Sequence, residues 1–258
     1  MTRDPVLDFY GELADDYHLI HDDWEKSLRR QADELDALIR ARIGAGTHSL
    51  LDCSCGIGTQ ALGLAALGYR VRATDISREL VTRAEHEAAK RGLGIGFGVA
   101  DMRALEAEVE GIFDVVLSCD NALAHMLTDS DLERAAAGMA AKAAPGGLVL
   151  ASIRDYDALA CERPRFAPLN IHDAPNGQRL MVQLWDWRAD GPIYDLTMFI
   201  LRRDGGEWRM SHHSSTLRAV RRDEVSAALA RAGLAEVAWH LPPASGYYQP
   251  VVTARKPA

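Results

Sequence analysis

The sequence predicts an α/β fold in which a mostly parallel sheet is covered by helices on both faces. Short apolar segments alternate with helical segments from residue 49 to about residue 153, and this alternation is typical of parallel sheets. Longer strand-like segments follow between residues 179 and 220, separated by Asp-Gly-Pro and Asp-Gly-Gly turns. Those turns favour an antiparallel β meander inserted late in the sheet.

The elements are expected in the following order. Helical segments run from residue 6 to about 42, where leucines recur at helical spacing before Gly44 and Gly46. Core strands are expected at 49–52, 70–74, 96–99, 113–118 and 148–153, and core helices at 60–67, 78–91 and 129–143. A turn is expected at 145–147, meander strands at 179–187, 194–203 and 208–220, a helix at 223–232, and closing strands at 235–240 and 248–254.

These patterns divide the chain into three parts. We expect an N-terminal helical lid at 1–46, a ligand-binding core at 47–155 and 217–258, and an inserted antiparallel subdomain at 156–216 that serves the substrate or acts as a lid. No internal repeat or low-complexity segment is apparent apart from Ala-rich helical stretches.

The composition of the chain argues against two classes of partner, nucleic acids and membranes. The chain has 258 residues, is 48% hydrophobic and carries a formal charge of -8, which argues against a nucleic-acid partner because phosphate contacts rely on Lys and Arg. Its apolar runs are shorter than the roughly 20 residues that span a bilayer, and its N-terminus lacks a secretory pattern. We therefore expect a cytoplasmic protein without a membrane partner, and the sequence leaves open a homo-oligomer.

No metal is expected. The four cysteines show none of the paired spacings typical of zinc or redox sites, and we interpret them as reduced, small apolar side chains. His212 and His213 would point to opposite faces of an extended strand, which makes them a poor metal pair.

The segment from Asp52 to Thr59 is a glycine turn between the first strand and the first core helix. In open α/β sheets, ligands bind at the carboxyl ends of the strands, so this turn predicts a nucleotide-like ligand. Gly56 and Gly58 let the backbone approach that ligand closely. Because the turn with Ala61 also satisfies the dinucleotide fingerprint, an NAD-dependent oxidoreductase is the alternative from another class.

Three carboxylates refine the choice of ligand. Asp75 follows the second strand, where it can accept hydrogen bonds from both hydroxyls of a ribose. Asp52 would repel a pyrophosphate but suits the ammonium and sulfonium charges of S-adenosylmethionine. Asp101, beside the apolar Met102, suits an adenine amino group and ring, although a helix cap is the alternative role. The residues expected at the cofactor are Asp52, Cys53, Gly56, Gly58, Asp75, Ile76, Asp101 and Met102.

As a set, Asp-x-x-Cys-Gly-x-Gly, the acid after the second strand and Ala-Asp-Met after the third resemble the class I, Rossmann-like S-adenosylmethionine-dependent methyltransferases. The resemblance covers residues 49 to 155 and the closing strands. It implies S-adenosylmethionine as the cofactor and S-adenosylhomocysteine as the product.

More narrowly, 118–126 (Ser-Cys-Asp-Asn-Ala-Leu-Ala-His-Met) and 153–157 (Ile-Arg-Asp-Tyr-Asp) resemble stretches of the glycine and sarcosine N-methyltransferases, which read Gly-Asn-Ser-x-x-His-Leu and His-Arg-Asn-Tyr-Asp. The resemblance implies that Asn121 and Arg154 hold the carboxylate of the acceptor. It also implies that Cys119 and His125 line the methionine part of the cofactor. Asp120, Ala122 and Ile153 depart from the pattern, which puts glycine in doubt as the substrate.

The N-terminal arm resembles that family loosely. The likeness implies that Arg30 holds the cofactor carboxylate and that Tyr17 and Trp24 cover the sulfonium; Arg29 fits about as well as Arg30. An amine must lose a proton before it can attack, and the candidates to accept this proton or to orient the lone pair are Tyr10, Tyr17, His18, His21 and His125. Of these, we prefer Tyr17 and His125.

Several assignments have a structural alternative. Arg154 suits a two-pronged contact to a carboxylate, but an ion pair with Asp155 or Asp157 would fix the turn instead. Tyr156 and Tyr247 are expected to complete the acceptor site; for Tyr247 and Tyr248, a glycine turn with one packed tyrosine is equally compatible. Trp185, Trp187 and Tyr194 are more typical of a core.

The sequence thus predicts transfer of a methyl group to a small molecule, most simply to a nitrogen of an amino acid-like or heterocyclic metabolite. Methylation of oxygen or carbon remains the alternative within this class, because the shape of the pocket sets the acceptor atom. A cofactor-binding protein without catalysis is a further alternative, which retention of the whole motif set disfavours.

Overall fold

The computed structural model describes residues 5–46, 48–174, 177–189 and 191–258. The strands of its larger sheet are β1 (Ser49–Asp52), β2 (Arg70–Asp75), β3 (Gly96–Val99), β4 (Phe113–Ser118), β5 (Ala143–Ser152), β10 (Ala235–His240) and β11 (Val251–Arg255). Within the described residues, these form a seven-stranded sheet in the order β10-β11-β5-β4-β1-β2-β3. Only β11 pairs antiparallel to its neighbours, β10 and β5.

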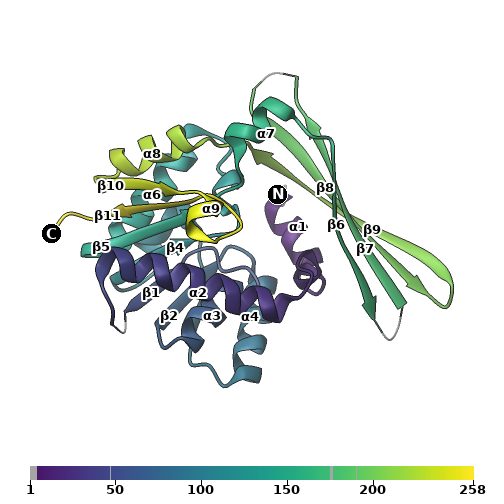
Figure 1. The fold of residues 1–258 in the computed structure, drawn as a ribbon, viewed down its shortest axis with the longest axis horizontal. Coiled ribbons are helices and arrows are strands. Elements are labelled where there is room, and N and C mark those ends of the chain that lie inside the picture. The colour runs from purple at the N-terminus through teal and green to yellow at the C-terminus, as the bar shows by residue number, and fades with distance from the viewer. Residues whose placement is uncertain (1–4, 47, 175–176, 190) are drawn as a thin grey trace.

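Helices cover both faces of this sheet (Figure 1). Those of the N-terminal half are α1 (Pro5–Leu13), η1 (Tyr17–Ile20), α2 (Trp24–Ile43), α3 (Thr59–Ala66) and α4 (Arg78–Arg91). They are followed by η2 (Met102–Ala104), α5 (Leu105–Glu108), η3 (Ala122–His125), α6 (Asp129–Lys142), α7 (Tyr156–Glu162), α8 (Arg222–Arg231) and α9 (Pro242–Ser245).

The central strands are apolar throughout because both of their faces are buried. Successive side chains of a strand point to opposite faces, so Leu50 packs in a cluster with Leu64 of α3, while Leu51 packs in another cluster with Met139 of α6. Such continuous apolar runs are typical of parallel sheets between two helical layers. The predicted fold class is confirmed.

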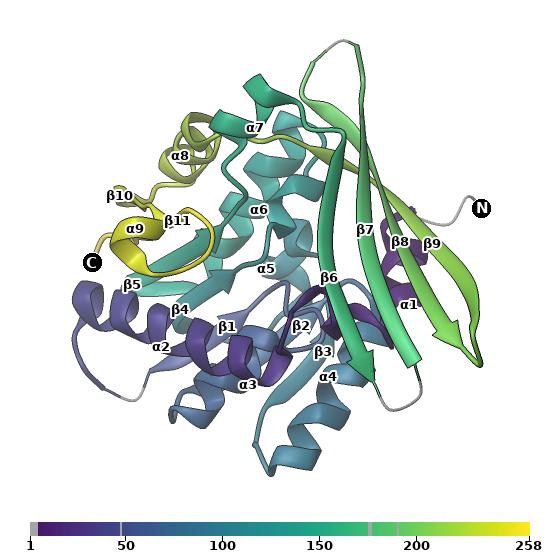
Figure 2. The same ribbon diagram turned by 45° about the vertical axis from the view of Figure 1, so that its right-hand side comes forward.

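A second, four-stranded sheet stands beside the core, with α1 between the two sheets (Figures 1 and 2). It is antiparallel, in the order β6 (Phe166–Ala174), β7 (Gly177–Trp187), β8 (Ile193–Asp204) and β9 (Glu207–Arg218). Helix α1 packs against β9. Arg202 of β8 pairs with Asp16, and Nε2 of His172 lies 2.7 Å from the carbonyl oxygen of Leu19, so the segment around η1 is tied to this sheet.

The structure differs from the sequence prediction mainly between residues 143 and 174; the short helices η2, α5, η3 and α9 were not predicted either. Strand β6 and helix α7 were not foreseen, because the segment 156–174 combines acidic residues, two prolines and an asparagine, which obscure any apolar period. The segment 145–147, expected as a turn, belongs to β5, which begins at Ala143 and whose pairing with β4 shifts register between Phe113 and Val115. In the described part of the chain, no helix is both long and apolar enough to cross a membrane.

Candidate active site

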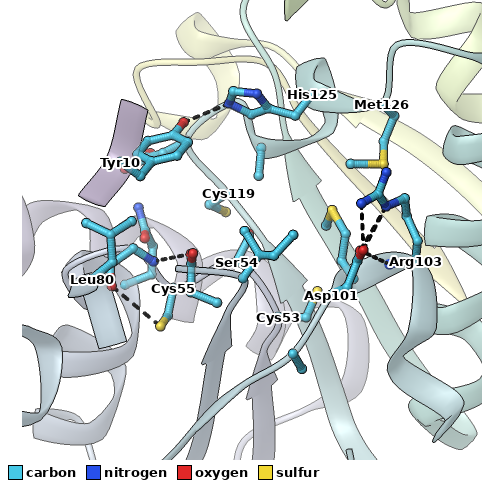
Figure 3. A pocket seen from close by; sticks show the side chains of 18 of the residues that line it. Tyr10, Cys53, Ser54, Cys55, Leu80, Asp101, Arg103, Cys119, His125 and Met126 are labelled. Atoms are coloured by element: carbon cyan, nitrogen blue, oxygen red, sulfur yellow. Dashed lines mark hydrogen bonds and ion pairs between the residues drawn. The ribbon is translucent and has the colours of Figure 1, made fainter. Parts of the chain in front are cut away.

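The first cavity lies at the carboxyl ends of β1, β2, β3 and β4, where the strand order of the large sheet reverses between β1 and β4. This is the place where open α/β sheets bind their ligands. The cavity has a volume of about 320 Å³. Figure 3 shows its wall, to which the loops after β1, β3 and β4 and the helix α1 all contribute side chains.

The glycine turn forms one edge of this cavity. Gly56 lines it, and a Cβ added there would meet only the ring of Tyr17, 3.8 Å away, so the missing side chain leaves space inside the cavity. Gly58 does not line the cavity. Its φ of +93° and the 3.1 Å between an added Cβ and Leu62 show that it permits the turn into α3 rather than contact with a ligand.

Asp75 lies at the end of β2 and lines the cavity. Its Oδ2 accepts the backbone N–H of Gly56 at 2.8 Å, and its Oδ1 accepts that of Ser77 at 3.0 Å. Burial raises the pKa of Asp75, and these hydrogen bonds partly oppose the shift. Each carboxylate oxygen keeps a lone pair, so the residue can accept two more hydrogen bonds.

Asp52 is buried beneath the turn and does not line the cavity among the described residues. One oxygen accepts the N–H of Ser54 at 3.3 Å, and the other has no partner among the described residues. Burial raises the pKa of Asp52 to about 8. The sequence predicts a negative charge here that faces the ligand, but with this pKa Asp52 is largely protonated at neutral pH.

Asp101 lines the cavity beside Met102 and also caps η2. Its carboxylate accepts the backbone N–H of Arg103 at 2.8 Å and pairs with the Arg103 guanidinium at 2.6 Å (Figure 3). Burial raises its pKa, but the contacts with Arg103 outweigh this and leave the pKa below its usual value. The cap that the sequence offered as the alternative is therefore present, and the same carboxylate borders the cavity.

The N-terminal arm brings two tyrosines to the site. Tyr10 of α1 and Tyr17 of η1 both line the cavity, and the Tyr10 hydroxyl lies 2.7 Å from Nε2 of His125 (Figure 3). Trp24 lines neither cavity; its indole N–H donates to Oγ1 of Thr59 at 2.9 Å. Arg30 also lines neither cavity, since its guanidinium lies on the half-exposed face of α2, 3.7 Å from Glu34.

A second cavity of about 500 Å³ continues beyond the first. Its wall combines the arm, the core loops and the four-stranded sheet, from which Gln183, Leu196, Met198, Ser215 and Leu217 point inward. Four residues line both cavities, namely Tyr10, Tyr17, Asp120 and His125. We call these four the junction residues. A small molecule in the second cavity would therefore face the ligand of the first across polar side chains.

Arg154 lines the second cavity and follows β5. Its guanidinium donates to the Tyr194 hydroxyl at 3.2 Å and lies 4.7 Å from the ring centre of Trp185. Burial lowers its pKa, but the surrounding phenols and the hydrogen bond to Tyr194 outweigh this and leave the pKa above its usual value.

The alternative role for Arg154 is wrong, because Asp155 and Asp157 both pair with Arg222 at 3.2 Å. Within the described part of the chain, no carboxylate lies within ion-pair distance of Arg154. A permanent cation without a counter-ion favours an anionic ligand.

Asn121 lines the second cavity next to this cation, and the buried Tyr156 supports both from behind. Asn121 accepts the backbone N–H of Arg154 at 3.1 Å and donates to the Tyr156 hydroxyl at 2.9 Å. Tyr156 is fully buried, lies outside both cavity walls and shares a 2.7 Å hydrogen bond with Tyr194. Of the pair after α9, Tyr248 lines the second cavity, whereas Tyr247 is fully buried behind Asp120.

The sequence and the fold are similar to those of known enzymes. Residues 50–147 match the model of a methyltransferase domain. Glycine/sarcosine N-methyltransferase from Parasynechococcus marenigrum is 29% identical over 193 residues, which cover 70% of this chain and 68% of that protein. Ubiquinone biosynthesis O-methyltransferase from Caulobacter sp. (strain K31) is 35% identical over 132 residues, covering 48% and 51%. Streptomyces venezuelae DesVI superposes with a TM-score of 0.78 at 20% identity, covering 95% of this chain and 98% of that one.

The chain is a class I S-adenosylmethionine-dependent methyltransferase. The oxidoreductase alternative is thereby set aside.

The first cavity of the methyltransferase fits this cofactor. Asp75 can accept both ribose hydroxyls, the space at Gly56 admits the ligand beside the backbone, and the apolar side chains of Ile76, Leu80 and Met102 suit the flat adenine ring. Cys53 and Cys119 also line this cavity, on the side of β1 and β4. These residues would hold S-adenosylmethionine, which supplies an electrophilic methyl carbon when bound.

The sequence did not single out every residue of the methyltransferase site. Tyr10 was one of several acid-base candidates, and its pairing with His125 spans 115 positions, which no local pattern reveals. Asp120 was noted only as a departure from the family pattern, although it lines both cavities. Gln183 and the apolar side chains of β8 and β9 carried no signal beyond strand alternation.

Proposed function

We propose that the methyltransferase transfers a methyl group to a nitrogen of a small, amino acid-like or heterocyclic metabolite that carries an anionic group. The observation that carries this proposal is Arg154, a cation with no carboxylate partner in the described structure, in a cavity that shares its junction residues with the cofactor cavity. A carboxylate bound by Arg154 would fix the acceptor by a charge-assisted contact.

Relatives support nitrogen as the acceptor atom. The names of the relative from Parasynechococcus marenigrum and of the dTDP-3-amino-3,6-dideoxyglucopyranose dimethyltransferase from Streptomyces fradiae both state N-methylation. The O-methyltransferase from Caulobacter, which matches over about half of each chain, keeps oxygen as the alternative acceptor atom. The departure at Asp120, Ala122 and Ile153 from the glycine-specific pattern supports an acceptor other than glycine itself.

Tyr10 and His125 would move the proton that an amine must lose before it attacks. Burial raises the pKa of Tyr10 far above its usual value, so Tyr10 stays a phenol. Its oxygen lies 2.7 Å from Nε2 of His125, and in the Nδ1-protonated tautomer of His125 the Tyr10 O–H would donate to Nε2. The Tyr10 oxygen then keeps lone pairs for an N–H of the acceptor. As the Tyr10 proton passes to His125, the oxygen takes the proton of the acceptor, which leaves the nitrogen with a free electron pair.

Tyr17 would orient and shield the reacting groups. Burial raises the pKa of Tyr17 as well, with the charges of Asp120 and Asp75 adding to the shift, so its hydroxyl serves as a hydrogen-bond donor and not as a base. Together with Tyr10, it would keep water from the space between the two cavities, where a dry and fixed geometry favours an in-line displacement.

We also propose the division of labour expected from the sequence. Residues 1–46 would act as a lid, which the position of Tyr10 and Tyr17 in both cavity walls supports. Residues 47–155 and 217–258 would hold the cofactor, and residues 156–216 would shape the acceptor cavity. A reducing, cytoplasmic setting would suit Cys53, Cys55 and Cys119, all buried free thiols, and the charge of -8 supports a small-molecule partner rather than a nucleic acid.

The test is turnover with a donor that carries a deuterated methyl group and a panel of amines, amino acids, nitrogen heterocycles, phenols and carboxylic acids. The expected result is a labelled N-methyl product together with S-adenosylhomocysteine. Fragmentation of the product by mass spectrometry places the label. A label found only on oxygen or carbon across the panel would contradict the proposal.

A further inference from the structure

Asp120 occupies a strained position at the start of the loop after β4. Its φ is +57° and that of Asn121 is +72°, so two consecutive non-glycine residues adopt the left-handed conformation. This conformation costs energy and is often found where a side chain is aimed for function. The backbone N–H of Asp120 donates to Oγ of Ser152 at 2.9 Å, and that of Asn121 donates to the Ser152 carbonyl oxygen at 3.2 Å, which holds the turn in place.

The Asp120 carboxylate has phenol donors but no cation. Its Oδ1 accepts the hydroxyl of Tyr248 at 2.5 Å and lies 3.0 Å from that of Tyr247, which can donate here or to Gln31. Burial raises the pKa of both tyrosines, and the nearby Asp120 raises it further. Both therefore remain protonated donors.

The second cavity therefore contains one uncompensated anion and one uncompensated cation. Of the two carboxylates in its wall, Asp155 pairs with Arg222, whereas Asp120 has no Lys, Arg or His within ion-pair distance in the part of the chain that is described. Arg154 is a cation without a carboxylate partner among the described residues. Asp120 belongs to the junction residues, so the anion lies on the side of the cofactor, and Arg154 lies in the acceptor cavity alone.

We propose that Asp120 binds the ammonium group of the acceptor while Arg154 binds its anionic end, so that the acceptor is a zwitterionic amine. This inference rests on the proposed function and adds the charge pattern of the substrate. Asp120 would hold the nitrogen beside the methyl donor, with the acceptor's length spanning from Asp120 to Arg154. A carboxylate beside the cofactor cavity also selects against neutral alcohols, because an alcohol is attracted to it less strongly than an ammonium group.

The atoms of the step balance. The ammonium loses one proton through Tyr10 to His125, as set out above, and becomes a neutral amine with a lone pair. That pair forms the new N–C bond while the C–S bond breaks and its electrons remain on sulfur. The product is a methylammonium ion, still positively charged beside Asp120, together with the neutral thioether S-adenosylhomocysteine.

The experiment measures binding to the enzyme saturated with S-adenosylhomocysteine. The probes are ω-amino acids from glycine to 6-aminohexanoate, each compared by calorimetry with the alkylamine and the carboxylic acid of the same chain length. We expect at least one amino acid to bind more tightly than both of its partners. In Asp120→Asn, its affinity should fall about 10- to 100-fold, the loss expected for a hydrogen bond to a charged group.

Three controls separate this role from others. The affinity of the matched carboxylic acid should stay unchanged in Asp120→Asn, because that probe has no ammonium group. Tyr248→Phe removes one donor but keeps the charge, so its loss should be smaller. Asp186→Asn removes an exposed carboxylate that pairs with Arg165 far from either cavity wall and should change nothing. Thermal melts of each variant establish that it is folded.

Each outcome decides. Unchanged amino acid affinity in Asp120→Asn would overturn the role of Asp120, as would a loss of S-adenosylhomocysteine binding with amino acid affinity kept. If the wild type binds none of the amino acids but methylates another amine of the turnover panel, the inference fails and the proposed function stands. If no nitrogen compound is methylated, both fail.

Discussion

Replacing Arg154 by glutamine should separate acceptor binding from cofactor binding. The side chain lines the acceptor cavity only, and its guanidinium has hydroxyl and amide partners but no carboxylate among the described residues. A bound acceptor carboxylate would therefore be its main electrostatic partner.

The loss can be sized from this arrangement. Truncating one partner of a desolvated, hydrogen-bonded charge pair costs about 2–5 kcal/mol. Glutamine keeps one or two donors, so we expect the lower half of that range, about 2–3 kcal/mol. Since 1.4 kcal/mol is a factor of ten, the acceptor KM should rise about 30- to 150-fold.

The assay is a steady-state titration of the acceptor at saturating donor, paired with calorimetric binding of S-adenosylhomocysteine. Arg163→Gln is the matched control, because Arg163 also stacks on a tryptophan, Trp187 at 5.7 Å, but is exposed and lines neither cavity. A normal acceptor KM together with weakened S-adenosylhomocysteine binding in Arg154→Gln would refute the placement of Arg154 in the acceptor site.

Tyr10→Phe removes the proton acceptor and should lower kcat about 100-fold or more. In a pH series, this loss of kcat should shrink as the free amine form of the acceptor becomes abundant. A loss of kcat that is independent of pH would contradict the relay. Because burial raises the pKa of Asp52 to about 8 and a bound cation favours its charged form, the complex holds fewer protons than the free enzyme. Cofactor affinity should then rise with pH up to about 8, and calorimetry in two buffers of different ionisation enthalpy should detect proton release, whereas proton uptake would refute the assignment. Gly58→Ala should destabilise the protein more than Gly68→Ala, because both glycines have φ near +95° but only Gly58 is crowded by Leu62. In denaturant melts, we expect the free energy of unfolding to fall by about 1–3 kcal/mol in Gly58→Ala and by about 1 kcal/mol in the control Gly68→Ala. Equal losses would exclude crowding as the cause.

The sequence was informative wherever the determinants are local. Leu50 and Leu51 belong to an apolar run between two helical segments, and this pattern requires only neighbouring residues to predict a parallel strand. Asp75 could be placed because strands of one parallel sheet end at the same edge. Asp52, at the end of the first strand, was placed in the same way, but its protonation depends on burial, which the sequence does not state.

Residues brought in by tertiary packing were harder to predict. Whether Tyr247 or Tyr248 faces the cavity depends on how the turn after α9 packs against α2, a matter of one position that no periodicity fixes. Trp24 has the residue type expected of a lid, but its indole N–H donates to Thr59 of α3, a residue 35 positions away. Tyr10 lies on α1, which packs against β9 of the four-stranded sheet, and its hydrogen bond to His125 joins residues 115 positions apart.

Among the described residues, only the second cavity takes part of its wall from the four-stranded sheet, and this separates two kinds of evolutionary change. No residue of β6 to β9 borders the first cavity among the described residues, whereas Gln183, Leu196, Met198 and Leu217 border the second. Substitutions on β7, β8 and β9 can therefore exchange one acceptor for another while the donor is held as before. A lineage that starts from this chain could diversify its substrates by drift in a single meander, without passing through a form that has lost its cofactor.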